Sequence, residues 1–142
     1  MDTVIPSAST PFGERVHRRL REERLIWLTT VGADGTPQPN PIWFLWDGAD
    51  SILMYSLPDA ARVRHIKRNP RVSLNLDGNG RGGDIIVLTG DAHISPDEPS
   101  ADENPEYVEK YNDFIARGFG TPRKFAAEYS LPIRIKLTKV RG

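Results

Sequence analysis

Cysteine is absent from this 142-residue sequence, and so is any excess of one charge sign. Without cysteine the chain can form no disulfide, no thiolate nucleophile and no cysteine-ligated zinc site. Nineteen basic residues balance nineteen acidic ones, whereas a nucleic-acid-binding protein usually carries a basic excess or a basic face. The histidines lie far apart, at positions 17, 65 and 93, and show no metal-ligand spacing. We therefore expect neither a metal centre nor a nucleic-acid partner.

Long hydrophobic runs are also missing, because no apolar stretch approaches the roughly 20 residues needed to cross a membrane. The first residues lack the basic-then-apolar pattern of a secretion signal, so we expect a cytoplasmic protein without a membrane partner. The composition, 38% hydrophobic and 27% charged, is typical of a globular protein. We expect a flexible N-terminal tail over residues 1–11 and a single domain over residues 12–142.

Hydrophobic periodicity predicts a mainly β protein with six strands and peripheral helices. Strands are expected near residues 25–31, 38–46, 51–56, 72–77, 84–95 and 133–138. Helices are expected over residues 12–24 and 59–68, and after the cap-plus-proline pairs at residues 104–105 and 121–122. Short hairpins, such as the one predicted at Asp34-Gly35, imply an antiparallel sheet. A closed or partly closed barrel would hide the edges of that sheet.

Three prolines alternate along the second predicted strand, at positions 37, 39 and 41. Because alternate residues of a strand point their backbone groups to the same side, these prolines remove every N–H donor from one edge and leave the carbonyls. Such an edge either discourages aggregation or faces a ligand that donates to the carbonyls. Trp43 lies on the same strand face as Pro39 and Pro41, so it is a candidate wall for a planar ring, although aromatic residues more often belong to a core or an interface.

The helix predicted from about Asp59 carries basic residues in its early turns, where acidic side chains are usual. A cation there costs a few tenths of a kcal/mol unless an anion lies nearby. A bound phosphate would be such an anion, contacted by Ser56, by backbone N–H groups and by a bidentate arginine. We single out Arg62 for this role and interpret the later basic residues, up to Arg71, as a solvated face.

Residues 78–84 read GNGRGGD, which is rich enough in glycine to suggest a dinucleotide-binding loop. That motif needs a helix after its glycines, whereas a strand is predicted here. The loop is therefore either a flexible hairpin turn or a backbone that approaches a ligand closely.

Several short runs together resemble the pyridoxamine-phosphate-oxidase-like split barrels, and within them the flavin- and deazaflavin-dependent oxidoreductases of actinobacteria. The resemblance spans about residues 15–140, and its most specific run is residues 62–72 (RVRHIKRNPRV). The other runs are residues 28–31 (LTTV), 34–37 (DGTP), 39–44 (PNPIWF) and 82–84 (GGD), the last leading through a strand to Thr89 and Gly90.

The resemblance implies a six-stranded antiparallel split β-barrel that forms a homodimer, with two equivalent cofactor sites in grooves between the subunits. Arg62 stands where the family has a phosphate-binding basic residue, commonly a lysine. The implied cofactor contacts from one subunit are Pro39, Asn40, Trp43, Met54, Tyr55, Ser56, Arg62 and Val63. Those from the partner subunit are Gly82, Gly83 and Asp84.

Pyridoxamine-phosphate oxidases carry basic substrate-binding residues in a C-terminal tail, whereas this chain has no histidine after His93. The resemblance therefore favours the members that use the deazaflavin coenzyme F420, and an oxidoreductase that transfers a hydride to a small acceptor. FMN is the alternative cofactor, because both coenzymes place a phosphate beside a tricyclic ring. A different class of function is a non-enzymatic protein that holds a flavin, a deazaflavin or haem.

Overall fold

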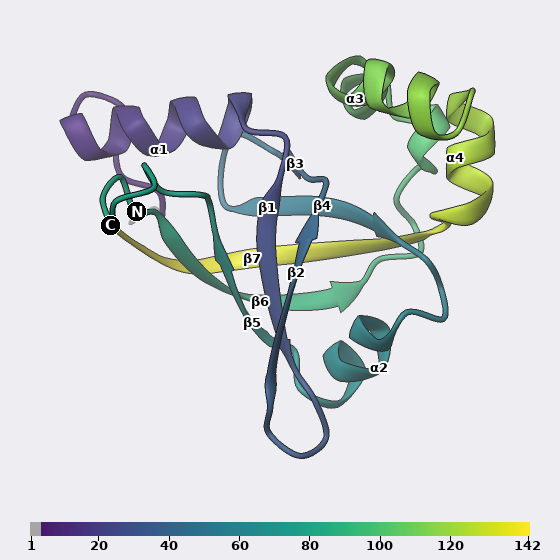
Figure 1. Cartoon of the computed structure of the whole chain (residues 1–142), viewed down its shortest axis with the longest axis horizontal. Helices are drawn as coiled ribbons and strands as arrows, with labels where there is room; N and C mark the ends of the chain where they lie inside the picture. The colour runs from purple at the N-terminus through teal and green to yellow at the C-terminus, as the bar shows by residue number, and fades with distance from the viewer. Residues whose placement is uncertain (1–3) are drawn as a thin grey trace.

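The computed structural model describes residues 4–142 and is mainly β, with peripheral helices (Figure 1). The strands are β1 (Ile26–Val31), β2 (Pro37–Ile42), β3 (Leu45–Trp46), β4 (Ser51–Ser56), β5 (Arg71–Asn75), β6 (Val87–Ile94) and β7 (Leu131–Arg141). The helices are α1 (Pro11–Glu22), α2 (Ala61–Arg68), α3 (Pro105–Gly118) and α4 (Pro122–Glu128), with a short 3-10 turn over Ala101–Glu103. Residues 1–3 of the expected flexible tail lie outside the described residues.

The strands form one antiparallel sheet in the order β2-β1-β5-β6-β7-β4-β3, which curls into a half-barrel. Figure 1 shows α1 at one end of the molecule and the α3–α4 pair at the other. The antiparallel, partly closed barrel expected from the sequence is therefore confirmed. No helix in residues 4–142 is both long enough and apolar enough to span a membrane.

The strand count is seven over the described residues, and the prediction of six was wrong at one place. The strand expected over residues 38–46 is divided into β2 and β3 at Trp43 and Phe44. The backbone N–H of Phe44 donates to the Tyr111 hydroxyl (2.7 Å), and its carbonyl accepts from Nζ of Lys110 (2.8 Å). Because both backbone groups of Phe44 hydrogen-bond to side chains of α3, they are not available to pair with a strand. The chain crosses here from one edge of the sheet to the other.

The proline-bearing strand β2 is an edge strand, as its sequence predicted. Its register against β1 pairs Leu28 with Asn40 and Thr30 with Gln38. The alternating prolines therefore turn their carbonyls away from β1, where no further strand pairs in the described part of the chain.

Two hydrophobic clusters share β4, all six of whose residues are buried. Ile52 and Met54 face the main cluster inside the half-barrel. Leu53 and Tyr55 face a second cluster, which they form with α3 and α4. Because neighbouring residues of a strand point to opposite faces, β4 separates the barrel core from the aromatic cluster beneath the terminal helices.

Strand β6 begins at Val87, three residues later than the predicted start at Asp84. Asp84 adopts a left-handed conformation with φ 57° and is held by α1. The guanidinium of Arg19, 5% exposed, donates to the carbonyls of Asp77 and Asp84. Arg15 adds a 2.8 Å ion pair to the Asp84 carboxylate. These contacts hold the glycine-rich loop against α1, and β6 therefore begins after the loop, at Val87.

Candidate functional site

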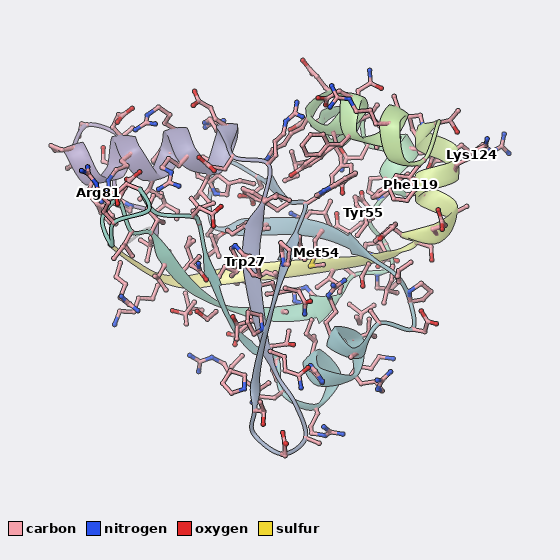
Figure 2. All side chains as sticks on the ribbon, viewed as in Figure 1. Trp27, Met54, Tyr55, Arg81, Phe119 and Lys124 are labelled. Atoms are coloured by element: carbon pink, nitrogen blue, oxygen red, sulfur yellow. The ribbon has the colours of Figure 1, made fainter. Side chains whose placement is uncertain are left out.

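A pocket of about 290 Å³ lies between the sheet and the α3–α4 pair. Its wall comes from the segment before β1, from the end of β2, from β4 and α2, and from the terminal helices. Six of its ten residues are aromatic and one is charged, and the full set is Leu25, Pro41, Ile42, Trp43, Tyr55, Arg62, Tyr107, Phe119, Phe125 and Tyr129. Figure 2 shows Tyr55 and Phe119 together on this side of the molecule.

The terminal helices begin at the predicted caps. The side chains of Asn104 and Thr121 accept from the backbone N–H groups of the first turns of α3 and α4, and a proline follows each cap. The cap at Asn104 sets the register that turns Tyr107 and Tyr111 of α3 inward. Spaced four residues apart, these two side chains lie on one helix face, which packs against β4 and forms part of the pocket wall.

Trp43 lies on the pocket wall and stacks on two aromatic side chains of the same chain. Its indole plane is parallel to the ring of Tyr111 (centroids 4.9 Å apart, 6° between planes) and to the ring of Phe125 (5.1 Å, 12°). Phe125 in turn stacks on Tyr129 (4.8 Å, 6°). Each such pair adds about 0.5–1.5 kcal/mol beyond the burial of area, so the wall is a connected aromatic layer.

Two tyrosine hydroxyls of the pocket wall have different surroundings. The Tyr55 hydroxyl donates to the Pro99 carbonyl (2.7 Å) and accepts from Nδ2 of Asn104 (3.3 Å). The Tyr107 hydroxyl is fully buried and has no hydrogen-bond partner among the described residues. Burial raises the pKa of both groups, so both stay protonated and able to donate at neutral pH.

Arg62 is the charged residue of the pocket wall, and its guanidinium is half-buried. Its Nη1 donates to Oγ of Ser56 (3.2 Å), and that hydroxyl donates to the carbonyl of Leu57 (2.9 Å). No carboxylate in residues 4–142 lies within ion-pair distance of Arg62. Burial lowers its pKa, but a guanidinium remains charged at neutral pH. The site therefore holds a partly desolvated cation with no counter-charge among the described residues, which favours a bound anion.

The start of α2, where Arg62 lies, has the features of an anion site. Ala60 at the cap position offers no side-chain acceptor, and the first turn contains no acidic residue. The other three α-helices are all capped by a Thr or Asn side chain. An uncapped helix start presents free N–H groups and a positive field. Together with Arg62, these backbone donors fit a phosphate group, while the Ser56 hydroxyl, in a residue that is 0% exposed, already donates to the Leu57 carbonyl.

The remaining predicted site residues fall into separate groups. Met54 and Val63 belong to the main hydrophobic core, and their side chains do not line the pocket. Pro39 and Asn40 are exposed on the edge strand β2, next to the wall residue Pro41.

The glycine-rich loop lies far from Arg62 within this chain. Figure 2 places Arg81 of this loop at the opposite end of the molecule from Tyr55. Gly82 and Gly83 line a second, open hollow beside β5 and β6, while the Asp84 carboxylate is engaged by Arg15 and Arg19. One copy of the chain thus brings Trp43, Tyr55, Ser56 and Arg62 together, but not Gly82, Gly83 and Asp84.

Sequence reasoning missed the part of the wall that comes from the terminal helices, namely Tyr107, Phe119, Phe125 and Tyr129. The helical spacing of the aromatic residues identified α3, but spacing alone does not distinguish a packed face from the lid of a pocket. Leu25 was missed as well, because the hydrophobic pattern placed it inside the first predicted strand, whereas its side chain is 44% exposed and lines the pocket.

Solved structures with the same fold include proteins of different functions. An F420 reductase is 25% identical, with a TM-score of 0.66 over 87% of this chain and 94% of that chain. General Stress Protein 26 from Bacillus anthracis is 20% identical, with a TM-score of 0.67 over 89% of both chains. The haem storage protein HutZ from Vibrio cholerae is 17% identical, with a TM-score of 0.60 over 90% of this chain and 92% of that chain.

The sequence itself places the chain in a family. No curated protein matches it. The pyridoxamine 5'-phosphate oxidase family matches residues 12–141, which is nearly the whole chain. The half-barrel agrees with the resemblance seen in the sequence. The chain therefore belongs to the pyridoxamine 5'-phosphate oxidase family.

Proposed function

We propose that this protein is an oxidoreductase that uses F420, and that Arg62 holds the phosphate of the coenzyme. The observation that carries the proposal is the half-buried guanidinium of Arg62, which has no carboxylate partner within residues 4–142 and lies beside Ser56 at an uncapped helix start. The F420 reductase, at 25% identity over 94% of its length, supports the choice of coenzyme.

The chain contributes binding and orientation to the proposed reaction. Arg62 and the first N–H groups of α2 would hold the phosphate, and Ser56 would position the Arg62 guanidinium. The aromatic pocket beside them would exclude water from the reacting groups. When bound, the reduced deazaflavin supplies a hydride. Tyr55 lies on the pocket wall with its phenol protonated, but its proton is directed to the Pro99 carbonyl. Tyr55 would therefore need to change partner before it could donate a proton to a substrate.

A homodimer is part of the proposal. The glycine-rich loop that contains Arg81 lies at the opposite end of the chain from Tyr55, which lines the pocket with Arg62 (Figure 2). Gly82, Gly83 and Asp84 of this loop can therefore contribute to the same cofactor site only from a second copy. The hollow that Gly82 and Gly83 line would then face the partner's phosphate site. The cytoplasmic location expected from the sequence remains a prediction.

FMN is the second candidate cofactor, because it carries a phosphate beside a tricyclic ring and Arg62 does not distinguish the two coenzymes. Haem binding has the support of the fold alone, through HutZ. The ten residues of the pocket wall include no histidine, methionine or cysteine, and tyrosine is the one haem-ligand residue type among them. An enzyme with F420 is therefore the stronger proposal.

A cofactor titration tests the proposal. Cofactor-free protein is titrated separately with F420, FMN and haem, and the complex that forms is then reduced and mixed with acceptors. We expect tight binding of F420 and turnover with the reduced coenzyme. Tight binding of FMN alone would indicate an FMN-dependent enzyme instead. Tight binding of haem without turnover would indicate a non-enzymatic haem-binding protein.

The matched control for this titration is Arg64→Ala. Arg64 is an exposed neighbour of Arg62 on α2, so its loss removes the same charge from the same helix without touching the pocket. F420 affinity should change little in Arg64→Ala and should fall in Arg62→Ala. Equal losses in both variants would show that the general charge of α2, rather than the Arg62 contact, attracts the coenzyme.

A further inference from the structure

The outer side of α2 carries a row of exposed basic residues. Arg64, Lys67 and Arg68 lie three to four residues apart, which places them on one face of the helix. None of the three has an ion-pair partner within residues 4–142. Arg71, exposed at the start of β5, extends this surface and pairs with Asp91 (3.3 Å). We call these four basic residues the basic face.

A surface of opposite charge precedes α3 and continues onto its first turns. Residues 96–109 contain no basic residue. Their exposed acidic residues without an ion-pair partner in the described part of the chain are Asp97, Asp102, Glu103, Glu106 and Glu109. Asp102, Glu103 and Glu109 line an open hollow of about 480 Å³, whose wall also includes Pro105 and Val108. We call these acidic residues the acidic face.

The two faces complement each other in charge and in shape, but they form no ion pair with each other within one chain. The basic face stands on a convex helix, whereas the acidic face borders a hollow. Lysine and arginine side chains can lay their apolar stems on Pro105 and Val108 while their charged ends reach the carboxylates. A second copy of this chain therefore offers the basic face a surface of matching charge and form.

A polyanion such as a nucleic acid fits the basic face less well. Proteins that bind nucleic acids gain long-range attraction from a basic excess, whereas this chain has a formal net charge of zero. The acidic face would also repel a long polyanion that reached past α2. Unpaired charges of both signs, gathered on separate faces of one chain, favour self-association instead.

We propose that the basic face of one copy docks on the acidic face of a second copy, and that the protein associates through this contact at low ionic strength. The contact goes beyond the proposed function, because none of these residues lines the cofactor pocket. It joins two different surfaces, so each added copy leaves one face free and association continues beyond a dimer. Exposed ion pairs are individually weak and are screened by salt, so the contact is reversible and depends on ionic strength.

Sedimentation velocity of the full-length protein at two salt concentrations tests this inference. At about 20 mM salt we expect the average mass to rise with protein concentration, and at about 300 mM salt screening should remove the rise. The apparent association constant should fall about tenfold or more between the two conditions. The mass at high salt reports the proposed homodimer, so a failure of that dimer and a failure of the docking contact are distinguishable. A mass that stays constant with protein concentration at low salt would overturn the docking contact.

Charge reversal locates the contact. Lys67→Glu with Arg68→Glu should abolish the growth in mass at low salt, and Glu103→Lys with Glu109→Lys should abolish it from the acidic side. The two reversals combined in one chain restore complementary faces and should restore the growth. Growth that persists in either pair, or that fails to return in the combined variant, would overturn the contact.

Arg117→Glu with Arg123→Glu is the matched control, because it changes the net charge as much as the reversal of α2 does, at exposed residues of the terminal helices. This variant should still associate at low salt. Its failure to associate would attribute the growth to net charge and overturn docking between the two faces. Tight binding of a heparin fragment by a wild type of constant mass would assign the basic face to a polyanion and overturn self-association.

Discussion

Two tyrosines one turn apart on α3 provide a matched pair for measuring the value of a buried hydrogen bond. Tyr107 and Tyr111 are both 0% exposed. The Tyr111 hydroxyl accepts from the Phe44 N–H (2.7 Å), whereas the Tyr107 hydroxyl has no partner in the described part of the chain.

The two Tyr→Phe variants should therefore differ in stability when no ligand is bound. Tyr111→Phe leaves the buried N–H of Phe44 without its partner and should lower the free energy of unfolding by about 1–3 kcal/mol. Tyr107→Phe removes an unpaired buried hydroxyl and should be neutral or stabilising by up to about 1 kcal/mol. Urea unfolding measures both, and an equal loss in the two variants would contradict the difference in hydrogen bonding.

Lys110 predicts a pH dependence of stability. Its Nζ donates to the Phe44 carbonyl (2.8 Å) and lies 3.8 Å from the centroid of the Phe44 ring. Burial lowers its pKa from 10.5 to about 8. Between these two values the unfolded chain binds more protons than the folded chain, so the contribution of Lys110 to stability rises with pH.

We therefore compare Lys110→Met, which keeps an apolar stem, with wild type at several pH values. The stability of wild type relative to Lys110→Met should improve as the pH rises from about 8 to about 10.5. Unfolding in urea at the ends of this window measures the change. A difference that stays constant with pH would show that Lys110 titrates normally in the folded protein.

Single residues were predictable where their local sequence was unusual. Arg62 could be singled out because a basic residue in the first turn of a helix breaks a local rule. The structure shows it half-buried without a carboxylate partner in residues 4–142, and its phosphate contact stays a prediction. Tyr107 could not be found in this way. Its unpaired hydroxyl depends on what α4 and β4 place around it, and a helical aromatic pattern contains no such information.

At the scale of elements, Arg19 joins α1 to the glycine-rich loop. Its buried guanidinium donates to the carbonyls of Asp77 and Asp84 and lies 3.1 Å from the Asp84 carboxylate. Arg18, the preceding residue, is half-exposed, and within residues 4–142 it pairs only with Glu14 of its own helix.

Arg19→Met should therefore destabilise the protein, while Arg18→Met should not. Loss of Arg19 leaves two carbonyls and part of the Asp84 charge without donors, which should cost about 3 kcal/mol in the free energy of unfolding. The change in Arg18→Met should stay within about 0.5 kcal/mol. Hydrogen exchange should also be faster in residues 77–84 of Arg19→Met. Similar stabilities for the two variants would show that Arg19 does not hold the glycine-rich loop against α1.

Elements whose signals are local were predicted well. The hairpin at Gly35 requires a positive φ, observed at +85°, and Asp34-Gly35 shows it directly in the sequence. The break between β2 and β3 was missed because it depends on Tyr111 and Lys110, which lie more than 60 residues away in the chain. The late start of β6 was missed for the same reason, since Asp84 is positioned by Arg19 of α1.

At the scale of the whole molecule, the predicted cofactor residues form two groups at opposite ends of one chain. Arg62 and Tyr55 line the pocket with residues of the terminal helices, whereas Arg19 of α1 holds the glycine-rich loop, whose Arg81 lies at the opposite end from Tyr55 (Figure 2). A site that uses both groups needs two chains. The sequence predicted a site between two chains only through the family resemblance, because contacts between subunits produce no periodic pattern in the amino-acid sequence.

We therefore expect the cofactor-free protein to sediment as a dimer at low micromolar concentration. Sedimentation velocity over a dilution series measures the state directly. Arg64→Ala serves as a control for non-specific association, because it alters exposed charge without touching the pocket. A monomer that binds cofactor as tightly as the concentrated protein would contradict the two-chain site.

The most direct test of the account is the affinity of wild type and Arg62→Ala for F420 and for the deazaflavin riboside that lacks its phosphate. We predict that Arg62→Ala weakens F420 by about 2 kcal/mol or more, roughly 30-fold in Kd. It should leave the riboside nearly unchanged, because the guanidinium then has no phosphate to contact. Equal losses for both ligands, or no loss for either, would contradict the assignment of Arg62 as the phosphate-binding residue.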